Sequence, residues 1–274
     1  MAASQERIAE YDPIDMLCIA AAREIIDGEA ILVGMGPPLL ACSVAKVVNA
    51  PNMAFVTESG PMDWTPSANN PKSPSQIADP ALTENSALVG DMIDALGMFL
   101  MGGGADAAVF QAAQIDLFGN MNTMLIGTYA NPKRRFPGTG GNVDGGASAN
   151  RMISTLPLEA RRFRPRVDFR TTAGYLDGPG ERVAAGLKPQ GPNVCVTTKC
   201  IFRYDTLDGG ESGSCEMYLD ALFEGVTVED VRDVIPWELR VADELKRTSP
   251  PTAEEMAAIG TLDSERIHRV PGRY

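Results

Sequence analysis

Histidine is almost missing from this 274-residue chain, which contains a single one, His268, close to its end. Ser-His-Asp and Cys-His catalysis both need an imidazole base, and histidine-rich metal sites need several imidazoles. The sequence therefore predicts no metal site. It assigns any chemistry to carboxylates and backbone groups, unless a partner chain supplies other groups.

Cysteine is sparse as well. The five cysteines form no C-x-x-C pair and their number is odd, which argues against a disulfide framework and against a structural zinc site. We expect reduced, mostly buried thiols. The five are Cys18, Cys42, Cys195, Cys200 and Cys215.

Long apolar runs and an excess of positive charge are also missing. No stretch approaches the roughly 18 consecutive apolar residues of a membrane span, and the opening residues MAASQERIAEYDP show no signal-peptide pattern. With 24 basic and 36 acidic residues, the formal charge of −12 repels nucleic acid and anionic membranes. We therefore predict a cytoplasmic protein with no nucleic-acid partner and no membrane contact.

Glycine and proline are plentiful, at 27 and 20 residues, and 44% of the chain is hydrophobic. This composition is typical of a globular protein with many tight connections. The length suits one large α/β domain or two small ones. We interpret the chain as a single domain over 1–274, with a core at about 15–240 and a C-terminal helical tail at about 241–274.

Helical and apolar strand patterns alternate along the chain. The pattern predicts a helix from Pro13 to about Asp27, a buried strand at Ala30–Val33, a helix at Leu39–Val48 and a second buried strand at Met53–Thr57. Further strands are expected at 105–110, 123–126, 152–155, 167–170 and 194–197, and further helices at 91–101, 228–234 and 253–259. This alternation predicts an α/β fold, an open and mostly parallel sheet with helices on both faces.

A segment rich in Pro, Ser and Asn, residues 61–90, interrupts this alternation. Long excursions of this kind inside a compact domain are usually functional or interfacial. We expect this one to run over the surface and to contact a partner.

A glycine turn, Gly34-Met35-Gly36, follows the first strand, and Glu58 ends the next strand about 20 residues later, as in a dinucleotide-binding fingerprint. However, Pro37 and Pro38 stand where backbone N–H groups should meet the pyrophosphate. The pattern therefore favours a tight turn and a helix start over NAD or FAD binding.

Glu58 itself stands at the carboxyl end of a buried parallel strand, where open α/β sheets place their ligands. The alternatives are a solvated loop acid or a salt-bridge partner. Gly60, two residues later, would let a ligand or the backbone approach closely.

Two further segments could stabilise negative charge. The run 138–146, Gly-Thr-Gly-Gly-Asn-Val-Asp-Gly-Gly, offers consecutive N–H groups for an anion or oxyanion, or is a flexible loop. Asn120 and Asn122, near a strand end, could donate to an oxyanion or form a plain Asx-turn. The segment from Lys133 to Arg170 contains nine basic residues and three acidic ones. This excess of positive charge suits a phosphorylated ligand, an acidic partner or a solvated basic face.

The order of these motifs resembles the class I coenzyme A (CoA) transferases, and within them the B-subunit type of glutaconate CoA-transferase. The resemblance covers roughly residues 15–240. It rests on Gly34-x-Gly36-x-Pro38, Thr57-Glu58-Ser59-Gly60, Gln111–Asp116 with Gly119-Asn120-x-Asn122, the loop from Pro132 to Gly141, Glu159-x-Arg161-Arg162-Phe163 and Gly174–Gly180.

The resemblance implies that Glu58 is the nucleophile of a ping-pong transfer of CoA from an acyl-CoA to a (di)carboxylic acid, through a glutamyl-CoA thioester. It implies an oxyanion donor at the backbone N–H of Gly141 or Asn142, with Asn120 or Asn122 as another. It places CoA near the glycine loop and its basic flank, here Gly138, Gly140, Arg134 and Arg135.

The family is built from two homologous halves with the site between them, and this chain resembles the B half. The resemblance therefore implies an A-type partner in a hetero-tetramer or hetero-octamer. Acyl-CoA and a carboxylate would be substrates, with no tightly bound cofactor. The alternatives are an acyl-CoA hydrolase or decarboxylase on the same fold, and a non-catalytic B half, which the presence of Glu58 disfavours.

Overall fold

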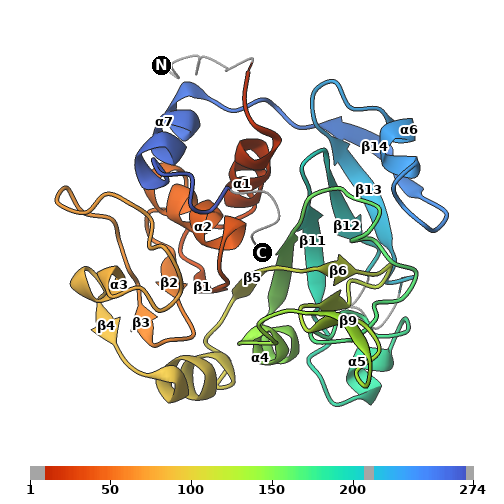
Figure 1. Ribbon diagram of the computed structural model, residues 1–274, viewed down its shortest axis with the longest axis horizontal. Helices are drawn as coiled ribbons and strands as arrows, with labels where there is room; N and C mark the ends of the chain where they lie inside the picture. The colour runs from red at the N-terminus through yellow and green to blue at the C-terminus, as the bar shows by residue number, and fades with distance from the viewer. Residues whose placement is uncertain (1–9, 207–212, 270–274) are drawn as a thin grey trace.

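A ten-stranded sheet forms the centre of the protein (Figure 1) in the computed structural model, which describes residues 10–206 and 213–269. Its strands are β1 (Ala30–Val33), β2 (Ala54–Val56), β3 (Pro61–Met62), β4 (Leu88–Val89), β5 (Ala107–Gln111), β10 (Arg151–Thr155), β11 (Pro192–Val196), β12 (Cys200–Tyr204), β13 (Met217–Leu222) and β14 (Arg240–Arg247). The order is β14-β13-β12-β11-β10-β5-β1-β2-β3-β4. The five neighbours from β2 to β11 are mutually parallel, which confirms the predicted α/β sheet.

One face of the sheet is covered by three helices, α1 (Pro13–Arg23), α2 (Pro37–Val48) and α7 (Ala253–Leu262). Alternate strand residues point to this face, among them Ile31 and Val33 of β1, which belong to one buried cluster with α1 and α2. Leu32, between them, belongs to the cluster on the opposite face. This two-sided burial explains why the parallel strands are continuous apolar runs in the sequence.

The other face is covered by shorter elements. These are η1 (Ile93–Leu100), α4 (Asn142–Ser148), the hairpin of β6 (Gln114–Ile115) with β7 (Met121–Asn122), and the hairpin of β8 (Leu125–Gly127) with β9 (Pro132–Arg135). Three more short helices, α3 (Ala81–Glu84), α5 (Glu181–Ala184) and α6 (Val228–Arg232), complete the described structure.

Several predicted elements differ from the structure. Residues 167–170 form no strand, because the Asp168 backbone N–H donates to the Gln114 side chain and the Asp168 carboxylate accepts from Gly127, so side chains replace a strand partner. The strand expected at 123–126 lies in the β8–β9 hairpin, outside the main sheet. The segment expected to begin a helical tail at about 241 is β14, a strand at the sheet edge whose charged residues are largely exposed.

The loop between β6 and β7 is held by a buried polar network around Asn120. Its amide nitrogen donates to Asp116 Oδ1 at 3.0 Å and to the Leu176 carbonyl at 2.7 Å, and its oxygen accepts from the Gly174 N–H. Asp116 also accepts from the backbone N–H groups of Phe118 and Asn120. Burial outweighs these hydrogen bonds and raises the pKa of the Asp116 carboxyl to about 6.

This raised pKa predicts a specific dependence of stability on pH. Between the usual aspartate pKa of 3.8 and about 6, the folded chain binds more protons than the unfolded chain, so Asp116 makes the free energy of unfolding fall as pH rises. The fall has an upper bound of about 3 kcal/mol for a shift of about two units. In Asp116→Asn this contribution is absent, and urea unfolding from pH 4 to pH 7 measures the difference from wild type.

The matched control is Asp233→Asn, which changes an exposed aspartate at the end of α6. Its difference from wild type should stay constant over the same pH range. A constant difference for Asp116→Asn as well would contradict the prediction.

Candidate active site

Glu58 lies at the carboxyl edge of the sheet, two residues after the end of β2. Since β1, β2 and β5 are parallel neighbours, their ends meet at this edge, and a cavity of about 430 Å³ opens there. The cavity is lined by residues that follow all three strands, including Met35 after β1 and Gln111–Ala113 at the end of β5, and by the loop 137–140. A crevice at the point where the chain turns to either side of β1 is the usual ligand position in such sheets.

The glycine loop closes directly on the Glu58 carboxylate. The backbone N–H of Gly141 donates a hydrogen bond to Glu58 Oε2 at 2.5 Å. A Cβ atom at Gly141 would lie 2.9 Å from the same oxygen, and one at Gly140 would lie 3.1 Å from it. With a Cβ at Gly141 the Glu58 side chain would have to shift, so the glycine allows this close approach of backbone and carboxylate.

The turn that carries Glu58 also depends on a glycine. Gly60 has a φ of +115°, and a Cβ atom there would fall 2.1 Å from the carbonyl oxygen of Gly90. The Thr57 N–H donates to the Pro61 carbonyl across the same turn. The turn thus packs against the strand pair β3–β4, and this contact fixes the direction in which Glu58 leaves β2.

The position of Gly141, the donor to Glu58, is fixed by α4, which begins at the next residue. Gly145 packs on Phe110 so closely that a Cβ would lie 2.3 Å from the ring. The buried guanidinium of Arg182 donates to the carbonyls of Gly146 at 2.9 Å and Ala173 at 2.7 Å. These contacts hold α4 against β5 and against the loop near 173, and so hold Gly141 in place.

Asn142 also lines the cavity, but its backbone N–H donates to the Thr139 carbonyl at 3.1 Å and closes the glycine turn. Of the two N–H groups expected as oxyanion donors, that of Gly141 is therefore the one directed at Glu58.

The basic flank of the glycine loop reaches the same cavity. Arg134 and Arg135 on β9 line it, with the Arg134 guanidinium over the Phe136 ring and the Arg135 guanidinium over the Tyr129 ring, each 5.1 Å from the ring centre. Gly138 lines it as well, with a φ of +127°. These positions combine an apolar wall with positive charge at the rim.

The structure does not bring the two asparagines to Glu58. Asn122 is fully buried, with its amide nitrogen donating to Gln114 Oε1 and to the Leu125 carbonyl, both at 2.7 Å, and its oxygen accepting from Met124 N–H. Asn120 is fully buried in the network with Asp116. Neither side chain lines the cavity in this chain, and both stabilise the β6–β7 loop.

Three residues that were not predicted as site residues complete the cavity. Gln111 stands at the end of β5 and donates to the Met35 carbonyl at 3.1 Å, while Ile77 reaches the cavity from the 61–90 segment. Gln111 could have been selected as a polar residue at a strand end. Ile77 and Phe136 carry no pattern that would mark them.

The cysteine thiols lie in the interior of the protein. All five cysteines are buried, and burial raises the pKa of every one of these thiols, that of Cys195 to about 12. Within residues 10–206 and 213–269 no group of three or more His, Cys, Asp or Glu residues is placed to hold a metal ion. None of the helices described is long and apolar enough to cross a bilayer.

Comparisons with known proteins identify the family of this chain. The family model described as Coenzyme A transferase matches residues 14–233. The chain is 33% identical over 257 residues to the B subunit of 3-oxoadipate CoA-transferase from Pseudomonas knackmussii, covering 94% of this chain and 95% of the relative. It is 32% identical over 248 residues to the B subunit of glutaconate CoA-transferase from Acidaminococcus fermentans, covering 89% of each.

Solved structures show the same fold. The crystal structure of glutaconate coenzyme A-transferase from Acidaminococcus fermentans matches with a TM-score of 0.85 and 30% identity, over 96% of this chain and 99% of that one. The decarboxylase AibA/AibB matches in fold, with a TM-score of 0.76 and 21% identity over 94% of this chain and 98% of that one. Given the family match over most of its length, the chain belongs to the coenzyme A transferase family, and it resembles the B subunits of these enzymes.

Proposed function

We propose that this chain, with an A-type partner, moves CoA from an acyl-CoA to a carboxylic acid, and that Glu58 is the covalent nucleophile. The observation that carries the proposal is the hydrogen bond from the Gly141 N–H to Glu58 Oε2 at the wall of the strand-end cavity. A carboxylate held by a backbone amide in a ligand-sized cavity is suited to acyl transfer.

In the first half-reaction, a Glu58 oxygen attacks the thioester carbonyl carbon of the acyl-CoA. Collapse of the tetrahedral intermediate breaks the C–S bond and leaves a mixed anhydride and CoA thiolate. The thiolate attacks the glutamyl carbonyl, the anhydride C–O bond breaks, and the donor acid departs as a carboxylate. Glu58 is then a CoA thioester, and the acceptor carboxylate reverses the sequence.

The Gly141 N–H is suited to the steps in which the glutamyl carbonyl is attacked. Its hydrogen bond already ends on Oε2, which becomes an oxyanion in those steps. Because the Asn142 N–H is used by the Thr139 carbonyl, we assign the donor to Gly141. A donor fixed before the reaction needs no reorganisation, and such a group typically contributes about 3 kcal/mol to transition-state stabilisation.

CoA would lie along the glycine loop, over Gly138 and Gly140, with Arg134 and Arg135 providing positive charge at the rim. Two of the relatives are named for 3-oxoadipate and glutaconate, which are dicarboxylates. We therefore expect a dicarboxylic acid as donor or acceptor here.

An exposed apolar surface beside the cavity supports the A-type partner. We call it the η1 surface, and it consists of Leu88, Val89, Met92, Ile93, Met98 and Met101, each more than half exposed. It adjoins the site, because a Cβ at Gly141 would lie 3.2 Å from Leu96 of η1. Contiguous exposed apolar surface marks interaction sites, and this one continues from the 61–90 segment. A hetero-tetramer or hetero-octamer would bury it.

The covalent mechanism predicts the effect of changing Glu58. Glu58→Ala should abolish CoA transfer while the complex with the A-type partner still assembles, and Glu58→Asp should lower kcat by orders of magnitude, because the carboxylate retreats by roughly 1.5 Å. Incubation of the wild-type complex with acyl-CoA alone should add CoA to Glu58, detected by intact mass and peptide mapping. Glu58→Gln keeps the shape and should show no adduct.

Ordinary transfer by Glu58→Ala, or an adduct on another residue, would contradict the mechanism. If wild type forms no adduct and instead releases free acid and CoA without an acceptor, the hydrolase alternative replaces it, with Glu58 as general base on water. Loss of CO₂ from the acyl group would indicate a decarboxylase.

The η1 surface predicts where the A-type partner binds. Met98→Glu should weaken assembly with this partner at least about tenfold, because it would place a charge in an apolar contact, and the present chain on its own should be inactive. Light scattering and activity at varied protein concentration measure both effects. The matched control is Ile26→Glu, an exposed apolar residue before β1 at the opposite sheet edge. Equal assembly of Met98→Glu and Ile26→Glu would reject this surface as the interface.

A further inference from the structure

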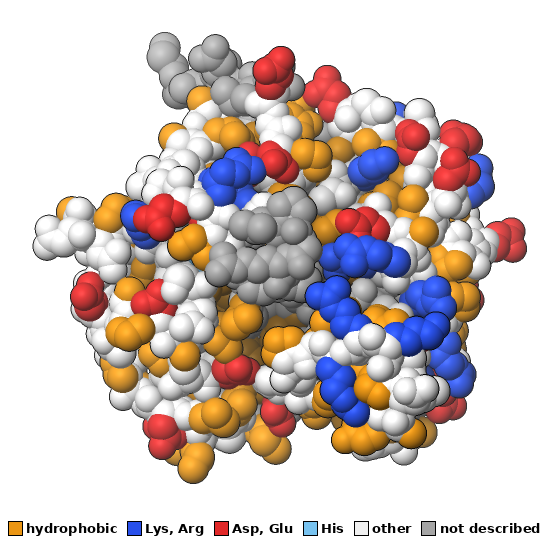
Figure 2. Space-filling model, in the orientation of Figure 1, with side chains coloured by type: hydrophobic (Ala, Val, Ile, Leu, Met, Phe, Trp, Pro, Cys, Tyr) orange, Lys and Arg blue, Asp and Glu red, His pale blue; other side chains and the backbone are white. Residues whose placement is uncertain are grey.

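Arg182, on α5, is a buried cation without a carboxylate partner. Figure 2 shows Lys and Arg side chains gathered at the surface on one face of the molecule, whereas Arg182 is 1% exposed. Within residues 10–206 and 213–269 no ion pair forms at its guanidinium, and burial lowers the pKa of this group. Such a charge is costly to bury unless other groups compensate it.

Main-chain carbonyls provide that compensation. The Arg182 guanidinium donates five hydrogen bonds of 2.7–2.9 Å, and all of them end on main-chain oxygens, those of Gly146, Ala173, Gly174, Lys188 and Gln190. A guanidinium has five N–H groups in a rigid plane, so each of them has an acceptor here. One side chain therefore fixes three segments relative to one another, namely α4, residues 173–174 and residues 188–190.

The segment 173–174 is also held by the loop between β6 and β7. Asn120 Oδ1 accepts from the Gly174 N–H at 2.9 Å, and Arg182 donates to the carbonyl of the same glycine. A Cβ at Gly174 would lie 2.3 Å from the carbonyl carbon of Gly119, so the two segments are in tight contact. The sequence motifs Gly119-Asn120-x-Asn122 and Gly174–Gly180 therefore meet at Gly174, and Arg182 connects them to α4.

The helix α4 carries the donor to Glu58. Its N-cap is Gly141, whose carbonyl accepts from the Gly145 N–H at 2.8 Å. At the next residue, Gly146, Arg182 holds the carbonyl, and a Cβ would lie 2.5 Å from Thr172 Cγ2. A shift of this short helix would therefore move the Gly141 N–H relative to Glu58 Oε2, which it contacts.

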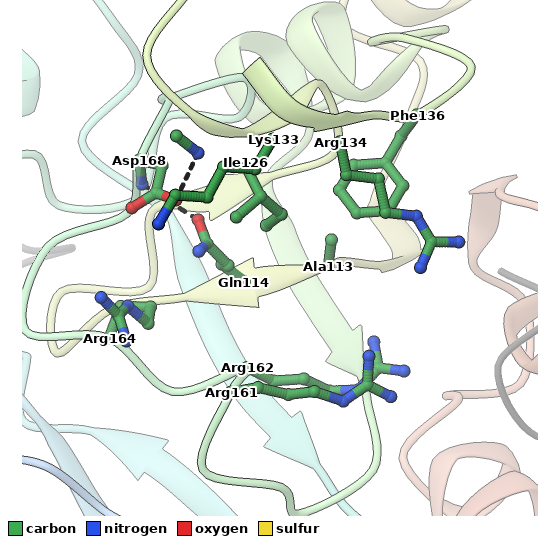
Figure 3. A pocket seen from close by; sticks show the side chains of 11 residues that line it. Ala113, Gln114, Ile126, Lys133, Arg134, Phe136, Arg161, Arg162, Arg164 and Asp168 are labelled. Atoms are coloured by element: carbon green, nitrogen blue, oxygen red, sulfur yellow. Dashed lines mark hydrogen bonds between the residues drawn. The ribbon is translucent and has the colours of Figure 1, made fainter. Parts of the chain in front are cut away.

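Arg182 lies outside the cavities on this side of the sheet. A second cavity, of about 520 Å³, adjoins the Glu58 cavity (Figure 3), and its basic side chains are Lys133, Arg134, Arg161, Arg162 and Arg164. The two cavities share Ala113, Arg134 and Phe136, and Arg182 lines neither of them. Any effect of Arg182 on a reaction at Glu58 must therefore pass through α4 and the segments that it holds.

We propose that Arg182 is a positioning residue for CoA transfer, which holds α4 so that the Gly141 N–H stays on Glu58. The inference rests on the proposed function, in which this N–H stabilises the oxyanion formed when the glutamyl carbonyl is attacked. A misplacement of about 1 Å in such a group can lower a rate about 100-fold. Lysine has three N–H donors and no rigid fork, so Arg182→Lys leaves carbonyls without partners and lets α4 shift.

The rate of Glu58–CoA adduct formation tests this role in the enzyme assembled with its A-type partner. At saturating acyl-CoA, Arg182→Lys should lower this rate constant by about tenfold or more. The acyl-CoA concentration that gives half the maximal rate should stay within about twofold of the wild-type value, because neither cavity lining has changed. Rapid quench followed by intact mass measures both quantities. A merely structural role would lower the free energy of unfolding and leave the rate unchanged.

The matched control is Arg23→Lys on α1, at the opposite face of the sheet. The Arg23 guanidinium also donates to two main-chain carbonyls, those of Ser249 and Pro250, and it pairs with Glu255. This variant should lower the free energy of unfolding, measured with urea, without changing the rate of adduct formation. Equal effects of Arg23→Lys and Arg182→Lys on the rate would overturn the proposal, as would an unchanged rate in assembled Arg182→Lys.

Gly146→Ala tests the position of α4 from its other side, and it decides the matter if Arg182→Lys does not assemble. The added methyl group would lie 2.5 Å from Thr172 Cγ2, so α4 should shift and the same rate should fall. Thr172→Ser removes Cγ2, and the double variant should recover most of the rate. An unchanged rate in Gly146→Ala, or no recovery in the double variant, would overturn the proposal. Absence of any adduct in wild type would instead reject the covalent function on which the inference rests.

Discussion

The hydrogen bond between the Gly141 N–H and Glu58 Oε2 is the contact on which the site depends. It joins two residues 83 positions apart in the chain. Glu58 lies two residues after β2, and Gly141 is the N-cap of α4. The geometry of the hydrogen bond is set by the sheet, because β2 leads to Glu58, α4 packs on β5, and β2 and β5 both pair in parallel with β1.

The hydrogen bond between Gly141 and Glu58 depends on the room around the carboxylate, which is set by the glycines beside it. A Cβ at Gly141 would lie 2.9 Å from Glu58 Oε2 and one at Gly140 would lie 3.1 Å from it, so glycine at both positions leaves room for the carboxylate in its present place. The same requirement recurs at Gly60, under Gly90, and at Gly145, over Phe110. Each of these close contacts restricts the backbone near Glu58 or near Gly141. The carboxylate is therefore held in place by packing on several sides. The glycine content of the sequence is thus partly a property of the site.

Much of this could be predicted from the sequence because buried parallel strands are short apolar runs and their ends are marked by turns. The strand at 30–33 and the helix after it are confirmed, and the end of β2 located Glu58 next to a cavity. Asn120 and Asn122 show the limit of such reasoning, since an amide near a strand end can face the site or the loop interior. Their burial depends on distant partners, Leu176 and Gln114. The second cavity, which is basic, is equally non-local, because Lys133 and Arg134 belong to β9 whereas Arg161, Arg162 and Arg164 lie in the loop after β10.

The distribution of charge links the two cavities. With a net charge of −12, the chain as a whole repels an anionic substrate, and this repulsion is screened beyond roughly 10 Å at ordinary ionic strength. Within that distance the cations of the second cavity, Lys133, Arg134, Arg161, Arg162 and Arg164, dominate, because they lie in a concave wall with few carboxylates. The groups that attract an anion thus lie beside the cavity of the Glu58 carboxylate, so that charge binding and the carboxylate proposed to react occupy adjoining cavities.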